Sequence, residues 1–133
     1  MLQKLNSRRG GFTLVEIMIV VAIIALLASI AVPNFLRARL RSQATACKQD
    51  LRMLDAAIEQ YAIENNKKPT DAVAFTNLKA YIKENSPLYY NGGNDTLGNA
   101  ITLSTISAGV KVPAATKTAT ADVADDTFWS PYN

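Results

Sequence analysis

The strongest constraint on this chain is a stretch of twenty residues without a formal charge, residues 17–36, close to the N-terminus. A helix of that length spans roughly 30 Å at about 1.5 Å per residue, which is the thickness of one hydrocarbon core. Its residues are apolar on every side, so lipid or other protein must enclose it. We therefore predict a membrane-spanning helix over residues 12–36, a polar leader over residues 1–11, and a head over residues 37–133.

Pro33 lies near the end of the apolar stretch. Proline has no amide hydrogen to donate, and its ring clashes with the carbonyl four residues earlier. We expect a helix kink at Pro33, or a locally unwound turn near residues 29–33.

Beyond Pro33 the apolar residues recur at alternating spacings of 4 and 3, which predicts an amphipathic helix over residues 37–65. The expected inward stripe consists of Leu40, Ala44, Cys47, Leu51, Leu54, Ile58 and Tyr61. Asn65, Asn66 and Pro69 then supply helix stop signals.

The sequence of the rest of the head predicts shorter helices and strands. A short helix is expected over residues 71–85, capped by Thr70 or Asp71. Short antiparallel strands joined by turns are expected within residues 88–113, beginning at Leu88-Tyr89-Tyr90. A small sheet packed on the long helix makes an α+β head. Residues 114–133 are predicted to be an irregular tail, which aromatic residues near its end, such as Trp129, hold against the head.

Composition argues against an enzyme. The chain has no histidine, which removes the commonest general base and the commonest metal ligand. Cys47 is the only cysteine, so an internal disulfide and a cysteine-based metal site are both impossible. No Gly-rich phosphate loop is present, and we expect neither catalytic residues nor a cofactor. Cys47 is interpreted as a small buried helix residue.

The net charge of +3 comes entirely from Lys4, Arg8 and Arg9. From Phe12 onward the chain has eleven basic and eleven acidic side chains, so a product that begins there is neutral. The basic pI therefore describes only the full chain, and we expect no nucleic-acid partner.

The N-terminus carries a specific motif. Arg8-Arg9-Gly10-Gly11 is followed by Phe12-Thr13-Leu14-Val15-Glu16-Ile17-Met18, the apolar run and Pro33. This arrangement resembles the N-terminal signature of type IV prepilins and of the pseudopilins of type II secretion systems. The resemblance implies a pilin-like α+β fold, with a long N-terminal helix packed by a small antiparallel sheet. It also implies that a membrane-embedded peptidase cuts between Gly11 and Phe12 and methylates Phe12.

Glu16 is the acidic fifth residue of the mature chain in this resemblance. A carboxylate near the lipid side of an apolar helix costs on the order of 1–3 kcal/mol unless it finds a partner. Cleavage creates that partner, because the freed ammonium on Phe12 of a neighbouring subunit can pair with Glu16. A buried ion pair fixes register more surely than it adds stability. We therefore hypothesise that Glu16 sets the axial stagger, and that Gly11, without a side chain, enters a narrow protease cleft.

The resemblance also implies partners and location. The chain is expected to form a homo-oligomeric helical filament and to meet a prepilin peptidase/methyltransferase, an inner-membrane assembly platform and an ATPase. Before assembly it is expected in the inner membrane as a single-pass protein with a cytoplasmic N-terminus, and afterwards in an extracellular pilus or a periplasmic pseudopilus. Charge does not decide this topology, because three basic residues precede the apolar run and three follow it.

The three basic residues that follow the run, Arg37, Arg39 and Arg41, could bind lipid headgroups, nucleic acid or carboxylates of adjacent subunits. A solvated face, or one that forms salt bridges between subunits, is the simpler interpretation.

Three functions remain open. The favoured one is the structural subunit, or prepilin, of a type IV pilus-like filament for adhesion or motility. The alternative is a major-type pseudopilin of a type II secretion system, in which Asp122, Asp125 and Asp126 are candidate calcium ligands. Such acids in a tail more often only improve solubility. A less favoured alternative is a small secreted binding protein with an ordinary signal peptide, whose mature chain begins at Val32.

Overall fold

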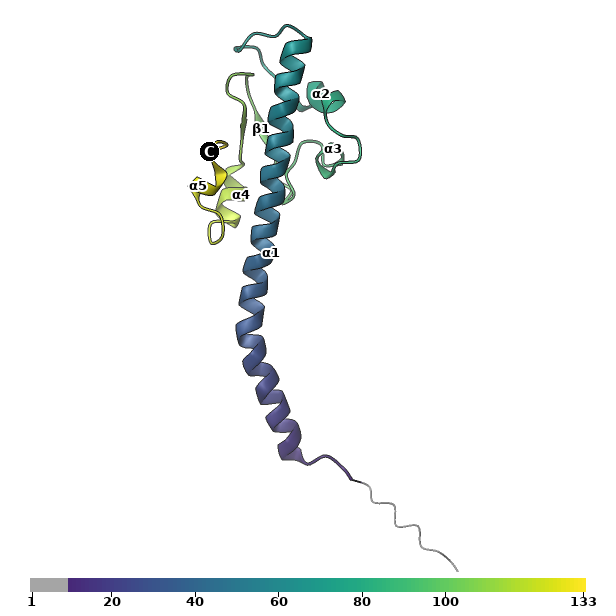
Figure 1. The fold of residues 1–133 in the computed structure, drawn as a ribbon, viewed down its shortest axis with the longest axis vertical. Helices are drawn as coiled ribbons and strands as arrows, with labels where there is room; N and C mark the ends of the chain where they lie inside the picture. The colour runs from purple at the N-terminus through teal and green to yellow at the C-terminus, as the bar shows by residue number, and fades with distance from the viewer. Residues whose placement is uncertain (1–9) are drawn as a thin grey trace, which may run out of the picture. The chain divides into compact units, whose positions relative to one another are not determined.

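The computed structural model describes residues 10–133, so most of the predicted leader and its basic residues Lys4, Arg8 and Arg9 lie outside the described residues. The chain divides into two compact units, Met1–Leu36 and Arg37–Asn133. One long helix, α1 (Leu14–Glu64), contributes to both units (Figure 1).

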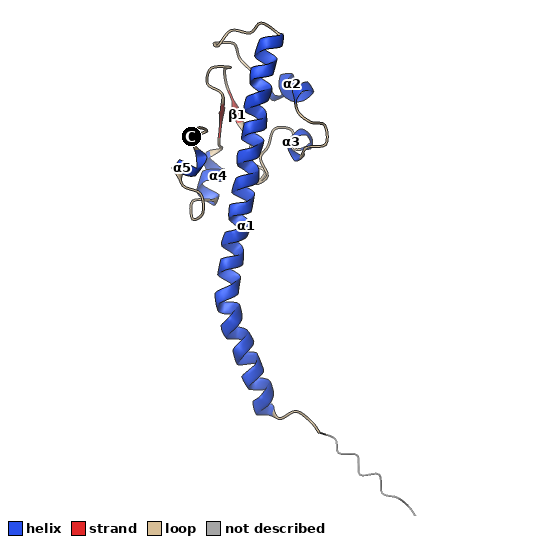
Figure 2. Cartoon of the chain, viewed as in Figure 1, coloured by secondary structure: helices blue, strands red, loops and turns tan. Residues whose placement is uncertain are grey.

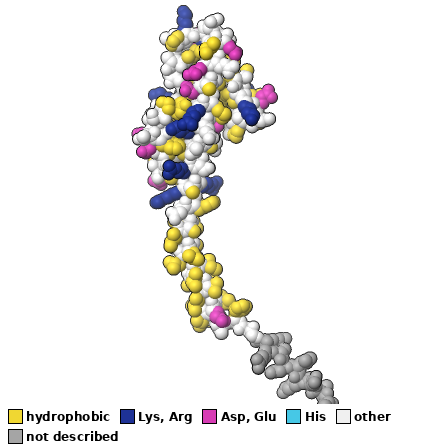
Figure 3. Space-filling model, in the orientation of Figure 1, with side chains coloured by type: hydrophobic (Ala, Val, Ile, Leu, Met, Phe, Trp, Pro, Cys, Tyr) yellow, Lys and Arg dark blue, Asp and Glu magenta, His cyan; other side chains and the backbone are white. Residues whose placement is uncertain are grey.

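The first unit is the apolar part of α1. Its large hydrophobic side chains are between 49% (Leu36) and 86% (Phe12) exposed, so they have no core of their own to enter. α1 is long and apolar enough to cross a membrane by length and composition, with a mean hydropathy of 2.9 in its most apolar window. Hydrophobic atoms cover this stretch of the helix in Figure 3. The surface therefore needs a partner outside this chain.

α1 continues through Pro33, so the expectation of an unwound turn is wrong. A single missing amide removes one helix hydrogen bond, and the bonds of neighbouring residues hold the backbone helical. The carbonyl that loses its amide donor is that of Ser29, whose hydroxyl separately donates to the Leu26 carbonyl at 2.7 Å. The kink at Pro33 stays a prediction.

The second unit is built on the amphipathic part of α1. The predicted stripe is confirmed at its centre, where Ala44, Cys47, Leu51, Leu54 and Ile58 are at most 2% exposed, while its ends are half-buried. The helix ends at Glu64, close to the predicted stop. Asn66 follows with a φ of 48°, a left-handed conformation common just after helix ends.

Short elements surround this stripe (Figure 2). In chain order they are α2 (Phe75–Leu78), the 3-10 helix η1 (Lys79–Tyr81), α3 (Pro87–Tyr90), β1 (Thr102–Leu103), β2 (Val110–Lys111), α4 (Ala114–Ala119) and α5 (Asp126–Trp129). β1 and β2 pair antiparallel, with Thr102 opposite Lys111 and Leu103 opposite Val110. The predicted α+β class with a small antiparallel sheet is confirmed.

The short helix predicted over residues 71–85 is reduced to α2 and η1. Thr70 and Asp71 do not cap it, because α2 begins after Ala74. The intervening backbone is extended: Ala72 forms a bridge with Thr105, and the Val73 amide donates to the Ser104 carbonyl at 3.1 Å. Pairing with a distant segment therefore replaces the first turn of the predicted helix.

The strand predicted at Leu88-Tyr89-Tyr90 is wrong, because these residues belong to α3. The Ser86 hydroxyl accepts a hydrogen bond from the Tyr89 amide at 3.3 Å, and Pro87 occupies the first helical position. Serine followed by proline is a helix start signal, and here it prevails over the β propensity of the tyrosines.

The irregular tail predicted over residues 114–133 is also wrong, since it contains α4 and α5. Trp129 is fully buried, which confirms the expected anchor, and Thr116 and Thr120 are buried with it. The Val112 amide donates to the Tyr132 carbonyl at 2.9 Å, which ties the C-terminus to the end of β2. Composition alone does not predict this helix, because its buried threonines depend on contacts with distant residues, such as the hydrogen bond from the Thr116 hydroxyl to Asp95.

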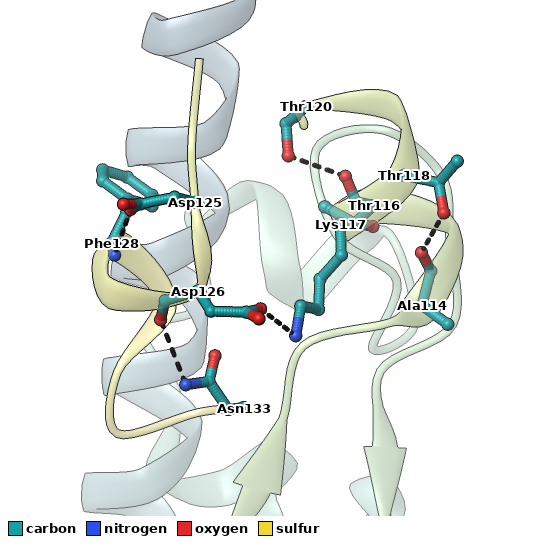
Figure 4. A network of polar contacts seen from close by, with 9 residues as sticks. All are labelled: Ala114, Thr116, Lys117, Thr118, Thr120, Asp125, Asp126, Phe128 and Asn133. Carbon is teal, nitrogen blue, oxygen red and sulfur yellow. Dashed lines mark hydrogen bonds and ion pairs between the residues drawn. The ribbon is translucent and has the colours of Figure 1, made fainter. Parts of the chain in front are cut away.

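Side-chain contacts hold α4 and α5 together (Figure 4). Lys117 and Asp126 form an ion pair at 2.5 Å. Asp125 caps α5 by accepting from the Phe128 amide at 2.8 Å, and the Asn133 side chain donates to the Asp126 carbonyl at 3.0 Å. The C-terminal segment is therefore an ordered part of the head.

Candidate functional site

The predicted processing site lies where α1 begins. The Thr13 amide donates to Glu16 Oε2 at 2.7 Å and the Thr13 hydroxyl does so at 3.0 Å, while the Glu16 amide donates to Thr13 Oγ1 at 3.2 Å. This reciprocal arrangement is a capping box, in which the Thr13 side chain accepts from the Glu16 amide and the Glu16 side chain accepts from the amide of Thr13, the residue before the helix. Glu16 therefore has a partner within its own chain.

The sequence contained the signal for this cap. Threonine followed three residues later by glutamate, ahead of an apolar run, is the usual capping-box pattern. The resemblance to prepilins assigned Glu16 only a partner in a neighbouring subunit. The structure adds a local role, because the Glu16 carboxylate helps to fix the residue at which α1 starts.

Gly11 is exposed and has no packing role in the fold. A Cβ atom added at Gly11 would meet nothing within 4 Å, and the same holds for Gly10. Neither glycine has a backbone conformation that excludes other residues. Any requirement for glycine at this position must therefore come from an outside partner.

A shallow hollow of about 350 Å³ lies beside the capping box. It is lined by Phe12, Glu16, Ile17, Ile19 and Val20. Four of these side chains are apolar and one is a carboxylate, so the hollow suits a group that is largely apolar and carries one positive charge. A phenylalanine with a free amino group has this character.

The structure also brings together a polar cluster that no sequence pattern predicted. Asp95 is fully buried, and its Oδ1 accepts from the Leu97 amide at 2.9 Å and the Asn99 amide at 2.8 Å. Its Oδ2 accepts from the Thr116 hydroxyl and from the Cys47 thiol, the latter at 3.6 Å. Asp95 therefore joins α1, its own loop and α4.

The cluster is structural. Burial raises the pKa of Cys47 to about 12, and the negative charge of Asp95 adds to this effect, so Cys47 stays a thiol. The expected buried position of Cys47 is confirmed. Asp50, next to it on α1, is 5% exposed, and burial followed by repulsion from Asp95 raises its pKa to about 6.

The raised pKa of Asp50 predicts that the stability of the head depends on pH. Its pKa is about 6 in the folded chain against an ordinary 3.8, so the folded state binds more protons between these values. Protonation should therefore stabilise the fold as the pH falls from 7 towards 4.5, by on the order of 2 kcal/mol. We expect Asp50→Asn to remove this contribution, measured by denaturant unfolding followed through Trp129. The exposed Glu59→Gln on the same helix is the control, and equal pH slopes for both variants would contradict the assignment.

Two of the three candidate calcium ligands form other contacts. Asp125 caps α5 and Asp126 pairs with Lys117, while Asp122 is exposed. Within residues 10–133 no three His, Cys, Asp or Glu side chains gather in a way that could hold a metal ion. Calcium binding at these positions stays a prediction.

Comparison with known proteins finds similarity to pilins and pseudopilins over about half of the chain. Residues 6–32 match the family model of the prokaryotic N-terminal methylation motif, a span that includes Gly11, Phe12 and Glu16. The type IV major pilin protein PilA of Myxococcus xanthus is 44% identical over 64 residues, which is 48% of this chain and 29% of that protein. The type II secretion system core protein G of Aeromonas hydrophila is 36% identical over 65 residues, 49% of this chain and 46% of that protein.

A third relative is the type IV wide pilus major component of Thermus thermophilus, which is 41% identical over 68 residues, 51% of this chain and 52% of that protein. The chain thus spans about half, or less, of the length of these relatives. No solved structure matches it.

Proposed function

We propose a function from the premise that this chain carries the N-terminal methylation motif and is similar over about half of its length to type IV pilins and type II secretion pseudopilins. In this proposal it is the precursor of a structural subunit of a type IV pilus-like filament. It is cut after Gly11, methylated at Phe12 and polymerised through its N-terminal helices.

The proposal rests on one observation: the apolar helix surface at and after the methylation motif is exposed. No residue of this surface is buried within the chain between Phe12 and Leu36. Lipid tails cover such a surface before assembly, and neighbouring helices bury it in a filament. Since lipid tails are as apolar as the helices, the gain on assembly comes from packing and polar pairing rather than from dehydration. The hollow beside Glu16 offers a place for that polar pairing.

The proposal includes a membrane-anchored precursor. A single apolar helix near the N-terminus, together with pilin and pseudopilin relatives, supports an inner-membrane subunit. A cytoplasmic N-terminus, the prepilin peptidase/methyltransferase, the assembly platform and the ATPase belong to the proposal.

Cleavage and methylation of the N-terminus test the proposed function. With a prepilin peptidase co-expressed, the intact mass of the product is expected to correspond to a chain that begins at Phe12 and carries one methyl group. Gly11→Val is expected to leave the precursor uncut, because a β-branched side chain obstructs an extended backbone in a narrow cleft. Gly10→Val is the matched control, since neither glycine contacts the rest of the fold.

Two results would argue against this processing. A mature chain that begins at Val32 would identify an ordinary signal peptide instead. Normal cutting of Gly11→Val would show that the glycine is not part of the recognition site.

The second candidate is a major-type pseudopilin of a type II secretion system. The type II core protein G of Aeromonas hydrophila matches about the same share of this chain as the pilins do. Processing does not distinguish the two, because both carry the motif. Rescue of secretion in a strain that lacks core protein G would favour the pseudopilin, while extracellular filaments that contain this chain would favour the pilin. Calcium binding by Asp122, Asp125 and Asp126 belongs to this second candidate.

A further inference from the structure

A second hollow, of about 560 Å³, lies in the head between the first turns of α1 after Leu36 and the loop that joins α4 to α5. We call it the charged hollow. Its lining consists of Arg37, Ala38, Arg41, Ala121, Asp122, Val123, Ala124 and Asp125. Figure 3 shows Lys and Arg side chains gathered on α1 just beyond its hydrophobic stretch.

The charged hollow presents both signs of charge without joining them. Arg37 and Arg41 line it from α1, and Asp122 and Asp125 line it from the loop. Within residues 10–133 the ion pair that forms at 4.0 Å or less is Lys117 with Asp126, so no pair crosses the hollow. The Asp125 Oδ1 atom accepts from the Phe128 amide, which leaves its other oxygen for a ligand. A ligand that carries one negative and one positive group could pair with the arginines through the first and with the aspartates through the second.

The position of the charged hollow along α1 indicates which ligands can reach it. Arg37 is the first charged residue after the apolar run, and Arg41 follows four residues later. At about 1.5 Å of helix rise per residue, Arg41 lies about 8 Å beyond Leu36, while the headgroup layer of a bilayer is about 5–8 Å thick. Both guanidinium groups are therefore at headgroup level when the apolar run spans the membrane.

The two kinds of side chain select a headgroup. Guanidinium groups bind phosphate oxygens through paired hydrogen bonds. Carboxylates accept hydrogen bonds from a primary ammonium, whereas a quaternary ammonium has no N–H to donate. Phosphoethanolamine carries a phosphate and a primary ammonium on one short chain. A purely anionic headgroup would pair with the arginines but would leave Asp122 and the second oxygen of Asp125 without a ligand group.

We propose that the charged hollow binds the phosphoethanolamine headgroup of a membrane phospholipid while the chain is held in the bilayer. This inference rests on the membrane-anchored precursor of the proposed function. Binding holds the head against the membrane surface until the subunit leaves for the filament.

The test uses the full chain in nanodiscs of equal phosphatidylethanolamine and phosphatidylglycerol, with native mass spectrometry of the lipids that the released protein retains. Retention of phosphatidylethanolamine is expected to exceed that of phosphatidylglycerol. Arg41→Gln should lower it about fivefold, or about 1 kcal/mol, which is typical for one basic residue at a membrane surface. Arg39→Gln is the matched control, because Arg39 is an exposed arginine of the same stretch that does not line the hollow.

Asp122→Asn separates headgroup recognition from simple attraction to phosphate. It should abolish the preference for phosphatidylethanolamine over phosphatidylglycerol, whereas the exposed Glu84→Gln should preserve it. Soluble glycerophosphoethanolamine should compete for the site, while glycerophosphate should compete less. The fluorescence of Trp129, the single tryptophan, verifies that each variant keeps its folded head.

Four outcomes overturn the inference. Equal retention of the two lipids by the unaltered chain would show that the charged hollow does not bind the phosphoethanolamine headgroup. Equal losses of retention in Arg41→Gln and Arg39→Gln would show the same. Both results would leave the proposed filament function intact. Loss of self-association in Arg41→Gln with unchanged lipid retention would assign the hollow to a second copy of the chain. Failure of the chain to enter nanodiscs at all would instead refute the membrane-anchored precursor, and the inference with it.

Discussion

Replacing Glu16 by alanine is expected to lower the amount of assembled filament at least about tenfold, which corresponds to a loss of about 1.4 kcal/mol per assembly contact. The substitution removes the acceptor of the Thr13 amide and the carboxylate in the hollow beside Phe12. It therefore removes both the helix cap and the proposed partner for the ammonium of a neighbouring Phe12. Filament recovered by shearing and centrifugation, normalised to processed subunit in the membrane, measures the effect.

Two further variants separate these roles. Glu16→Gln keeps a side-chain oxygen that can cap the Thr13 amide but removes the charge. Thr13→Ala keeps the charge but removes the hydroxyl contacts of the capping box. If the ion pair sets the axial stagger, Glu16→Gln should assemble as poorly as Glu16→Ala, and Thr13→Ala should lose less than half. Normal filament from Glu16→Gln would leave only the capping role.

Replacing Asp95 by alanine is expected to destabilise the head by about 3–5 kcal/mol, which is enough to unfold a domain of marginal stability. Asp95 accepts hydrogen bonds from two backbone amides, the Thr116 hydroxyl and the Cys47 thiol. Its removal would leave four buried or half-buried donors without their partner. Denaturant unfolding of the full chain in detergent, followed through the buried Trp129, measures the loss.

Two comparisons make the Asp95 result specific. The exposed Glu84→Ala removes the same charge and should change the unfolding free energy by less than about 0.5 kcal/mol. Cys47 should become accessible to alkylating reagents in Asp95→Ala, because its thiol loses both its acceptor and its cover. An unchanged unfolding midpoint together with an unreactive Cys47 would show that the cluster contributes little.

The long helix was predictable because its signals are local. The apolar run, the 4 and 3 spacing of the stripe and the stop signals after Glu64 each act within a few turns of the backbone. The N-cap formed by Thr13 and Glu16 is equally local, and its spacing alone could have identified it. The resemblance to prepilins implies only a partner in another subunit for Glu16, and it gives no information about this cap.

The part of the head that follows α1 was harder to predict because its helices and strands are only two to six residues long. Segments of this length have weak propensities of their own, and distant contacts decide their conformation. Pairing with residues 104–105 keeps residues 72–73 extended, and burial of Trp129 orders a segment whose composition predicted an irregular tail.

The sequence by itself determined where the N-terminal methylation motif lies, which stretch is apolar enough to span a membrane and which face of α1 forms the core, because each follows from the order and spacing of neighbouring residues. Tertiary structure alone decided what surrounds Asp95 and which charges share a hollow. Cys47, Asp95 and Thr116 meet across separations of 48 and 21 residues, and Arg41 faces the loop at Asp122 from another part of the chain. No local pattern encodes such meetings, because they depend on how the short elements pack on the long helix.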